Sequence, residues 1–290
     1  MAMGAEGWID LSGRAKFLLS GPDAERYLNG QTTNDVRRAV EDAAMPSLVT
    51  TAKGKIEADV YISRRGSAAF LIDGPEELQM ELQLRLDRYL IADNAELIDV
   101  TGEFRLIHVL GPEPAAAGGI ARRAANRFGI PGWDFVIPAG VAFKTTGPEL
   151  PVEALEAIRI AHGLPRWGAE LSSDVLPQEA RLEDRCLDFH KGCYIGQEVI
   201  SRIKSVGRVN RLLCAMVAEA DETPEAGDLL FFEDREVGQV TSVAKNLQLA
   251  RMTALGYVKR DAVAPGTRLR AGKSEKTLSS HLEIRETPLC

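Results

Sequence analysis

The segment that decides the fold reads Asp188-Phe189-His190-Lys191-Gly192-Cys193-Tyr194-Ile195-Gly196-Gln197-Glu198. Gly192 and Gly196 allow the backbone to approach another element closely or to take a positive φ. Between them lies Cys193, two residues after Lys191. A nearby cation favours the thiolate over the thiol, so this setting predicts a reactive cysteine. A buried structural cysteine is the alternative, because cysteines are often found in protein cores.

A metal site is the other reading of this segment. Cys186, His190 and Cys193 have the spacing i, i+4 and i+7, which would align them on a helix. Gly192 argues against a continuous helix at this point. The paired Cys-x-x-Cys spacing of structural zinc sites is absent from the sequence. We therefore expect no metal site formed by the protein alone.

Lys191 is the first residue of a basic stretch. Residues 191–211 carry five positive side chains and one negative side chain, in a chain whose formal net charge is −7. This local charge fits an anionic ligand, and it fits a solvated basic linker equally well. The acidic chain and the lack of aromatic residues interleaved with the basic ones argue against direct nucleic-acid binding.

Periodicity and punctuation outline the rest of the chain. Its 290 residues predict two domains. We expect helices at 22–30, 75–91, 115–128 and 151–162, and a hairpin whose tip is Lys53-Gly54-Lys55 between strands at 48–50 and 56–62. After residue 211, short alternating runs separated by glycine and proline predict a small antiparallel β module. The predicted domains are therefore residues 1–210 and 211–290.

The cellular compartment follows from what the sequence lacks. The first residues show no basic stretch followed by an apolar run, and no stretch of 18 apolar residues occurs. Four cysteines in a chain of this length do not form a disulfide framework. We expect a cytoplasmic protein with reduced thiols and no membrane partner.

The segment from Lys191 to Glu198 closely resembles the signature of the YgfZ-type folate-binding proteins, a branch of the glycine-cleavage T-protein (aminomethyltransferase-like) superfamily. The similarity extends over nearly the whole chain. Further segments resemble motifs of the superfamily: Gly21-Pro22-Asp23-Ala24, Thr33-Asn34-Asp35-Val36, Lys53-Gly54-Lys55-Ile56, residues 159–165, residues 176–180, Gly238-Gln239-Val240-Thr241-Ser242 and Ala254-Leu255-Gly256-Tyr257-Val258.

The resemblance implies an α+β fold in which a folate-binding N-terminal part of two packed subdomains precedes a C-terminal antiparallel β-barrel. It implies that tetrahydrofolate or another reduced folate is bound, and that the protein supports iron–sulfur cluster assembly or repair with iron–sulfur client or assembly proteins as partners, in some cases affecting tRNA modification. Cys193 is then the functional thiol. The residues implied to line or shape the folate pocket are Asn34, Asp35, Arg159, Lys191, Gly192, Tyr194, Gly196, Gln197, Glu198 and Arg202.

Folate-dependent aminomethyl transfer is the alternative function. In the transferases, the segment resembling Arg159–Gly163 has a glutamate that holds the polar edge of the pterin, and this chain has Ala161 there. An alanine side chain cannot accept the hydrogen bonds of the pterin N–H groups. This difference argues against transferase activity.

Overall fold

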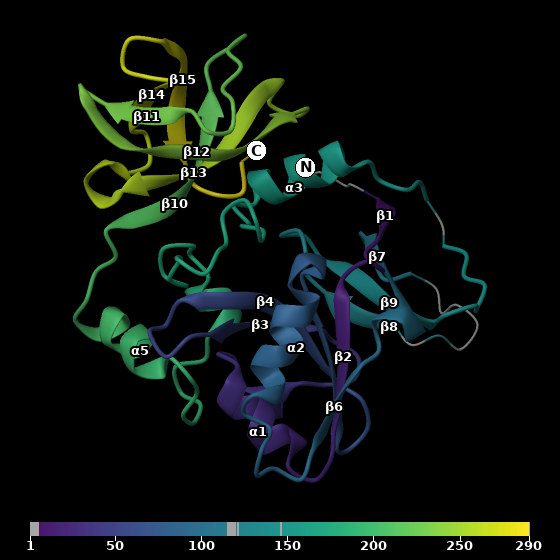
Figure 1. Cartoon of the computed structure of the whole chain (residues 1–290). Helices are drawn as coiled ribbons and strands as arrows, with labels where there is room; N and C mark the ends of the chain where they lie inside the picture. Colours follow the sequence, from purple (N-terminus) through teal and green to yellow (C-terminus); the bar gives the residue numbers. More distant parts are fainter. Residues whose placement is uncertain (1–5, 115–119, 121, 146, 290) are drawn as a thin grey trace. The chain divides into compact units, whose positions relative to one another are not determined.

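The computed structural model describes residues 6–114, 120, 122–145 and 147–289. The chain forms two compact units. We call them the sheet unit (Ala5–Glu149 and Leu182–Arg202) and the barrel unit (Met1–Gly4, Leu150–Arg181 and Ile203–Cys290). Figure 1 shows the strands and helices of each unit. The expected boundary near residue 211 stays a prediction.

A five-stranded antiparallel sheet forms the centre of the sheet unit, in the order β3-β4-β5-β2-β6. The predicted hairpin is present, since β3 and β4 pair antiparallel on either side of residues 51–55. The strands are β2 (Ala15–Ser20), β3 (Met45–Thr50), β4 (Ile56–Arg64), β5 (Ala69–Gly74) and β6 (Glu96–Asp99).

Alternation along β4 gives this sheet two different faces. Ala58, Val60 and Ile62 belong to an apolar core that also contains residues of helices α1 (Ala24–Gln31) and α2 (Gln79–Asp87). Asp59 and Tyr61 point to the opposite face, because successive side chains of a strand alternate.

The predicted helices at 22–30 and 75–91 are present but shorter than expected. A 3-10 turn at Glu76–Leu78 precedes α2, and residues 88–91 lie outside the helix. Leu82 and Leu86 are buried as their spacing predicts, whereas Tyr89 is exposed.

The second sheet of this unit has the order β1-β7-β9-β8. Its strands are β1 (Gly7–Asp10), β7 (Phe104–Leu110), β8 (Arg122–Ala125) and β9 (Gly132–Pro138). The helix expected over residues 115–128 is therefore wrong at 122–125, while 115–119 and 121 lie outside the described residues. Pairing of β8 with β9 overrides the helix propensity of the alanines in this stretch.

A buried ionic network lies in the sheet unit. Arg127 donates hydrogen bonds to Asp73 Oδ1 and Oδ2 (2.9 and 2.7 Å) and to both carboxylate oxygens of Asp134 (2.7–3.0 Å). His108 Nδ1 lies 2.8 Å from Asp134 Oδ1. Burial alone would raise the pKa of Asp134, but the Arg127 guanidinium and the His108 hydrogen bond more than offset this and lower it.

The barrel unit contains a closed barrel in the strand order β10-β13-β12-β11-β14-β15. This confirms the predicted α+β fold with a C-terminal antiparallel barrel. Helix α3 (Val152–Ala161) confirms the expected helix, with Pro151 before its first residue and Gly163 at φ +67° after its end. The barrel strands are β10 (Arg211–Ala218), β11 (Leu229–Phe232), β12 (Arg235–Asn246), β13 (Arg251–Lys259), β14 (Arg268–Gly272) and β15 (Leu278–Arg285).

The buried network generates a stability prediction. Asp134→Asn leaves the Arg127 guanidinium with one carboxylate instead of two, and breaking a buried ion pair costs about 3–5 kcal/mol. We expect urea denaturation followed by circular dichroism at pH 7 to show a loss of this size. Asp234→Asn removes an exposed ion pair with Arg270 and serves as the control, with an expected loss below about 1 kcal/mol. Equal small losses in both variants would show that the network contributes little.

Candidate functional site

Residues 188–196 lie against the turn that contains the Thr33-Asn34-Asp35 motif. The Asp188 backbone N–H donates to Thr33 O (3.0 Å), and the Ile195 backbone N–H donates to Gly30 O (3.1 Å). The Thr33 hydroxyl donates to Cys186 O (2.6 Å). Two motifs separated by about 150 residues in the sequence are therefore one hydrogen-bonded structure within the sheet unit.

Lys191 is the centre of this structure. Its ammonium group donates to Asn29 O (2.7 Å), Thr32 O (2.5 Å) and Asn34 O (2.7 Å). An ammonium group has three N–H bonds, so these carbonyl oxygens use all of them and none is left for Cys193. Burial lowers the pKa of Lys191 to about 7, against the opposing effect of the nearby Asp35 and Asp188 carboxylates.

Asn34 and Asp35 hold the turn from the other side. The Asn34 side chain donates to Pro46 O (3.0 Å), and the Asn34 backbone N–H donates to Ser47 Oγ (2.9 Å). Asp35 accepts two hydrogen bonds of 2.8 Å from the Arg37 guanidinium, which lower the pKa of this carboxyl. Asp35 Oδ1 also accepts a hydrogen bond from the Arg37 backbone N–H (3.1 Å), so the side chains of both predicted residues hold backbone of this turn in place.

Gly196 brings the segment against the β3–β4 hairpin. It has φ +90°, and a Cβ atom placed there would lie 2.5 Å from Thr51 O and 3.1 Å from the Cα of Gly54. The Thr50 hydroxyl donates to Ile195 O (2.6 Å). Two family motifs therefore meet backbone to backbone, and a side chain at position 196 would force them apart.

Cys193 lies exposed at the open side of this anchored segment. A Cβ atom added to the neighbouring Gly192 would meet nothing within 4 Å, so the backbone here faces open space. Cys186 and Cys214 are buried, and burial raises the pKa of Cys186 to about 12. Among the described cysteines, Cys193 is the one that a reagent or a partner protein can reach.

Tyr194 points into the protein, whereas the neighbouring Cys193 is exposed. Its side chain is buried, burial raises its pKa to about 12, and its hydroxyl has no hydrogen-bond partner among the described residues. Gln197, Glu198 and Arg202 lie on helix α5 (Gln197–Ser205), where Glu198 and Arg202 are exposed. The structure brings the signature residues together on one segment, with Cys193 outside and Tyr194 inside.

The face of β4 opposite the apolar core of α1 and α2 holds a residue that sequence reasoning missed, Asp59. Asp59 Oδ1 is buried and has no hydrogen-bond partner among the described residues. Burial raises the pKa of this carboxyl, with the Arg14 charge acting in the opposite direction. Next to it on β4, Tyr61 accepts a hydrogen bond from Arg185 (2.7 Å), which lies on α4 (Glu183–Cys186).

The sequence contained a signal for Asp59. Glu57, Asp59 and Tyr61 alternate with Ile56, Ala58, Val60 and Ile62, the pattern of a strand with one apolar face. Such a strand normally turns its polar face to water. The pattern could not show that the Asp59 carboxylate oxygen Oδ1 is buried and not in contact with water.

Arg159, the remaining predicted ligand residue, belongs to the barrel unit. Its guanidinium donates to Glu156 (2.7 and 2.5 Å), Glu170 (3.0 Å), Leu164 O (3.0 Å) and Ser242 Oγ (2.6 Å). These bonds use all five of its N–H donors. Arg159 therefore ties α3 to strand β12, and a ligand-binding role for it stays a prediction.

Position 161 is closed in the same unit. Ala161 is buried, and its carbonyl accepts a hydrogen bond from the Leu289 backbone N–H (2.7 Å). The chain's last residues also pass close to Gly163, where an added Cβ atom would lie 2.8 Å from Thr287 Cγ2. Ala161 is thus covered by backbone of the same unit.

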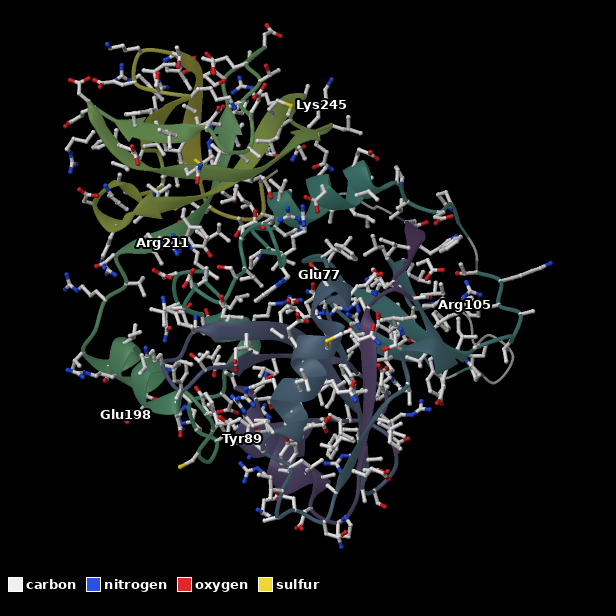
Figure 2. All side chains as sticks on the ribbon, in the orientation of Figure 1. Glu77, Tyr89, Arg105, Glu198, Arg211 and Lys245 are labelled. Atoms are coloured by element: carbon white, nitrogen blue, oxygen red, sulfur yellow. The ribbon has the colours of Figure 1, made fainter. Side chains whose placement is uncertain are left out.

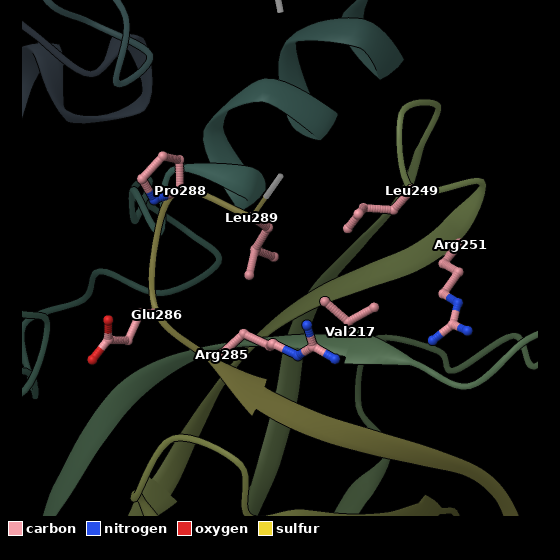
Figure 3. Close-up of a pocket in the computed structure, with 7 residues that line it drawn as sticks. All are labelled: Val217, Leu249, Arg251, Arg285, Glu286, Pro288 and Leu289. Carbon is pink, nitrogen blue, oxygen red and sulfur yellow. The ribbon is translucent and has the colours of Figure 1, made fainter. Parts of the chain in front are cut away.

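The barrel unit has a hollow of about 440 Å³ lined by apolar and cationic side chains. Figure 3 shows Val217 beside the Arg285 guanidinium, with Leu249 and Arg251 to their right and Pro288, Leu289 and the carboxylate of Glu286 to their left. Within the described residues, Glu219, Glu222 and His281 also place possible metal ligands within 4.8 Å of one another. Glu222 already accepts a hydrogen bond from the His281 backbone N–H (2.5 Å).

Two protein-family models match this chain. The GCVT N-terminal domain matches residues 3–117, and the Glycine cleavage T-protein C-terminal barrel domain matches residues 210–288. The chain belongs to the glycine cleavage T-protein family. No helix among the described residues of this family member is long and apolar enough to cross a membrane.

The relatives of this chain include aminomethyltransferases and YgfZ proteins, the two kinds that the sequence resembles. An aminomethyltransferase of Shouchella clausii is 24% identical over 96% of this chain and 85% of its own length. The tRNA-modifying protein YgfZ of Klebsiella pneumoniae is 29% identical over 72% of this chain and 71% of its own, which confirms the YgfZ-type resemblance.

The fold is also that of the T-protein family. The crystal structure of the glycine cleavage system aminomethyltransferase T from Bartonella henselae matches with a TM-score of 0.84 at 17% identity. The match covers 98% of this chain and 86% of the other. At this identity the likeness shows a shared fold.

A substitution of Lys191 distinguishes two roles of this residue: holding the segment to the turn, or making the Cys193 thiol more reactive. Lys191→Met leaves three carbonyl oxygens without a donor, so we expect the free energy of unfolding to fall by about 2–4 kcal/mol. The alkylation rate constant of Cys193 in the folded variant should change less than about threefold, because the ammonium group does not serve the thiol.

Lys53→Met at the exposed hairpin tip is the matched control, with an expected change within about 0.5 kcal/mol. A Lys191→Met variant of unchanged stability whose Cys193 reacts about tenfold more slowly would show instead that Lys191 activates the cysteine.

Proposed function

We propose that the protein binds tetrahydrofolate or another reduced folate and uses Cys193 to support assembly or repair of iron–sulfur proteins in the cytoplasm. The observation that carries the proposal is the placement of Cys193. It is exposed on a segment that Lys191 and Gly196 fix to two other family motifs. A thiol on a fixed base meets a partner in one orientation, which lowers the entropy lost on binding.

Folate binding is supported by polar groups that the fold leaves unsatisfied. Buried polar groups without hydrogen bonds are costly, and native proteins retain few of them. Asp59 Oδ1 and the Tyr194 hydroxyl are both of this kind. A pterin offers N–H donors and ring acceptors, so a carboxylate and a phenol suit it. We infer that Asp59 accepts hydrogen bonds from the pterin and that Tyr194 lines the pocket.

A conservative substitution tests the folate part of the proposal. Asp59→Asn replaces a buried carboxyl whose ionised form is disfavoured by burial, so we expect the ligand-free protein to become about 1–2 kcal/mol more stable. Its affinity for tetrahydrofolate should fall at least about tenfold, because an amide no longer accepts in the same way.

Titration of both proteins with tetrahydrofolate, followed by calorimetry, measures the effect. Asp42→Asn, at an exposed carboxylate in the same unit, should bind as the wild type does. Equal affinities in the wild type and Asp59→Asn would remove Asp59 from the binding site.

The iron–sulfur part rests on the chemistry of one thiol. Thiolates are the ligands that iron–sulfur clusters prefer. A cluster takes four such ligands, and Cys193 supplies one. The protein therefore needs a client or assembly protein to supply the others, and an exposed thiol is the form in which it can share them.

Cys193→Ala tests this part in cells that lack the wild-type protein. We expect the variant to leave the activities of iron–sulfur enzymes low, while Cys214→Ala, which changes a buried cysteine, restores them. In the purified wild-type protein, Cys193 should be alkylated at least about tenfold faster than Cys186 or Cys214, because burial protects the latter two. Full restoration by Cys193→Ala would contradict the proposed role.

The YgfZ relatives are described as tRNA-modifying proteins. We infer that any effect of this protein on tRNA is indirect, through enzymes that depend on iron–sulfur clusters. Arg211, at the end of the basic stretch, forms an ion pair with Glu179 (Nε to Oε1, 3.3 Å), and its guanidinium lies over the ring of Tyr257. The net charge of −7 also disfavours binding to a phosphate backbone.

Aminomethyl transfer is less well supported. The transferase relatives cover 90% or more of the chain, so the architecture alone does not separate the two functions. Ala161 does separate them, because it is buried and offers the pterin no side-chain acceptor.

A further inference from the structure

The hollow of about 440 Å³ in the barrel unit lies on the outer face of the barrel. Cys214, Met216 and Ala218 of β10 belong to the barrel core, so Val217 faces outward, because the side chains of a strand alternate. Val217 is nevertheless only 6% exposed, since it lies at the floor of the hollow. The volume is in the range of small-molecule sites, about 300–1,000 Å³.

One buried side chain fixes two walls of this hollow. Asn246 ends strand β12 and follows Lys245, which Figure 2 labels. Its side-chain carbonyl oxygen accepts hydrogen bonds from the backbone N–H groups of Gln248 and Leu249 (3.0 and 3.1 Å). Its side-chain amide donates to Leu289 O (3.4 Å). The turn that carries Leu249 and the segment that carries Leu289 are therefore held together, and the hollow forms without a ligand.

Two guanidinium groups border the hollow from the strands on either side of β10. Val217 pairs with Thr253 of β13 and with Glu283 of β15. Arg251 and Arg285 each lie two residues from these partners, so their side chains share the outward direction of Val217. In Figure 3 the Arg285 guanidinium lies beside Val217, and Arg251 lies to their right. Both cationic groups thus border the same apolar floor.

These guanidinium groups keep donors that the described residues do not use. Arg285 Nε lies 2.8 Å from Glu283 Oε1, which leaves Nη1 and Nη2 of Arg285 without a partner in the described part of the chain. Arg251 has no side-chain partner there. The carboxylate of Glu286, which also lines the hollow, points away from both guanidinium groups in Figure 3. The planar fork of a guanidinium suits a carboxylate or a phosphate.

We propose that this hollow binds a small organic anion in which one carboxylate or phosphate group is attached to an apolar body. The anionic group accepts hydrogen bonds from Arg251 and Arg285. The apolar body lies against Val217, Leu249 and Leu289, where it is removed from water. The ligand needs both halves, because each half has its own set of partners.

This site is separate from the proposed folate site and from the exposed thiol. Its lining residues all belong to the barrel unit, whereas Asp59 and Cys193 belong to the sheet unit. Asp59→Asn and Cys193→Ala should therefore bind the organic anion as the wild type does. The two proposals can then fail independently of each other.

Isothermal titration calorimetry of the full chain with four probes tests the proposal: phenyl phosphate, benzoate, inorganic phosphate and benzyl alcohol. We expect phenyl phosphate or benzoate to bind with a dissociation constant of about 0.1–2 mM. Inorganic phosphate and benzyl alcohol each lack one half of the ligand and should bind at least about tenfold more weakly. The tighter of the two aromatic anions identifies the anionic group that the site prefers.

Substitutions locate the site. Arg251→Gln should raise the dissociation constant of the tighter aromatic anion at least about tenfold. Arg260→Gln changes an exposed arginine of the barrel unit that does not line the hollow, and should leave it unchanged. Leu249→Ala should weaken binding about threefold to tenfold by removing apolar contact. Leu247→Ala, at an exposed leucine of the same turn, is its matched control.

Two outcomes would overturn the proposal. One is a wild type that binds neither aromatic anion at concentrations up to about 20 mM. The other is equal affinity in the wild type and Arg251→Gln, because the anion would then bind elsewhere. Arg251 is exposed, so this variant should keep the circular dichroism spectrum of the wild type, and a loss of binding then reports the site.

Discussion

The hydrogen bonds from the Lys191 ammonium group to the carbonyl oxygens of Asn29, Thr32 and Asn34 are the interaction on which the site depends. Three carbonyl dipoles that converge inside a protein need a donor with three N–H bonds, and lysine provides one without any acceptor of its own. This contact fixes residues 188–196 to a turn far away in the sequence.

The Lys191 contacts both fix the ends of the segment 188–196 to the turn and leave its middle exposed. The backbone bonds of Asp188 and Ile195 to the turn leave Gly192 and Cys193 on the open side. Gly196 adds the close approach to the hairpin, which no residue with a Cβ atom could make. The segment therefore holds one exposed thiol, that of Cys193, on a backbone that is fixed on both sides. Asp59 Oδ1 and the Tyr194 hydroxyl are two of the buried polar atoms that have no hydrogen-bond partner among the described residues.

Local patterns predicted much of the fold. Pro151 and Gly163 marked both ends of α3, the alternation at 56–62 marked β4, and the glycine-punctuated runs after residue 211 marked the barrel. Residues 122–125 misled because alanine favours a helix locally, whereas pairing with β9 is a long-range interaction. The contacts of the Lys191 side chain could not be predicted for the same reason, because its hydrogen-bond acceptors lie about 160 residues earlier in the chain. Asp59 was missed because alternation shows which residues share a face but not what covers it.

Amide hydrogen exchange of residues 188–195 tests the anchored segment most directly. We expect slow exchange at Asp188 and Ile195, whose N–H groups donate to the turn, and exchange at Cys193 at least about 100-fold faster. Uniformly fast exchange across the segment would show that the turn does not hold it, and would contradict its anchoring by Lys191.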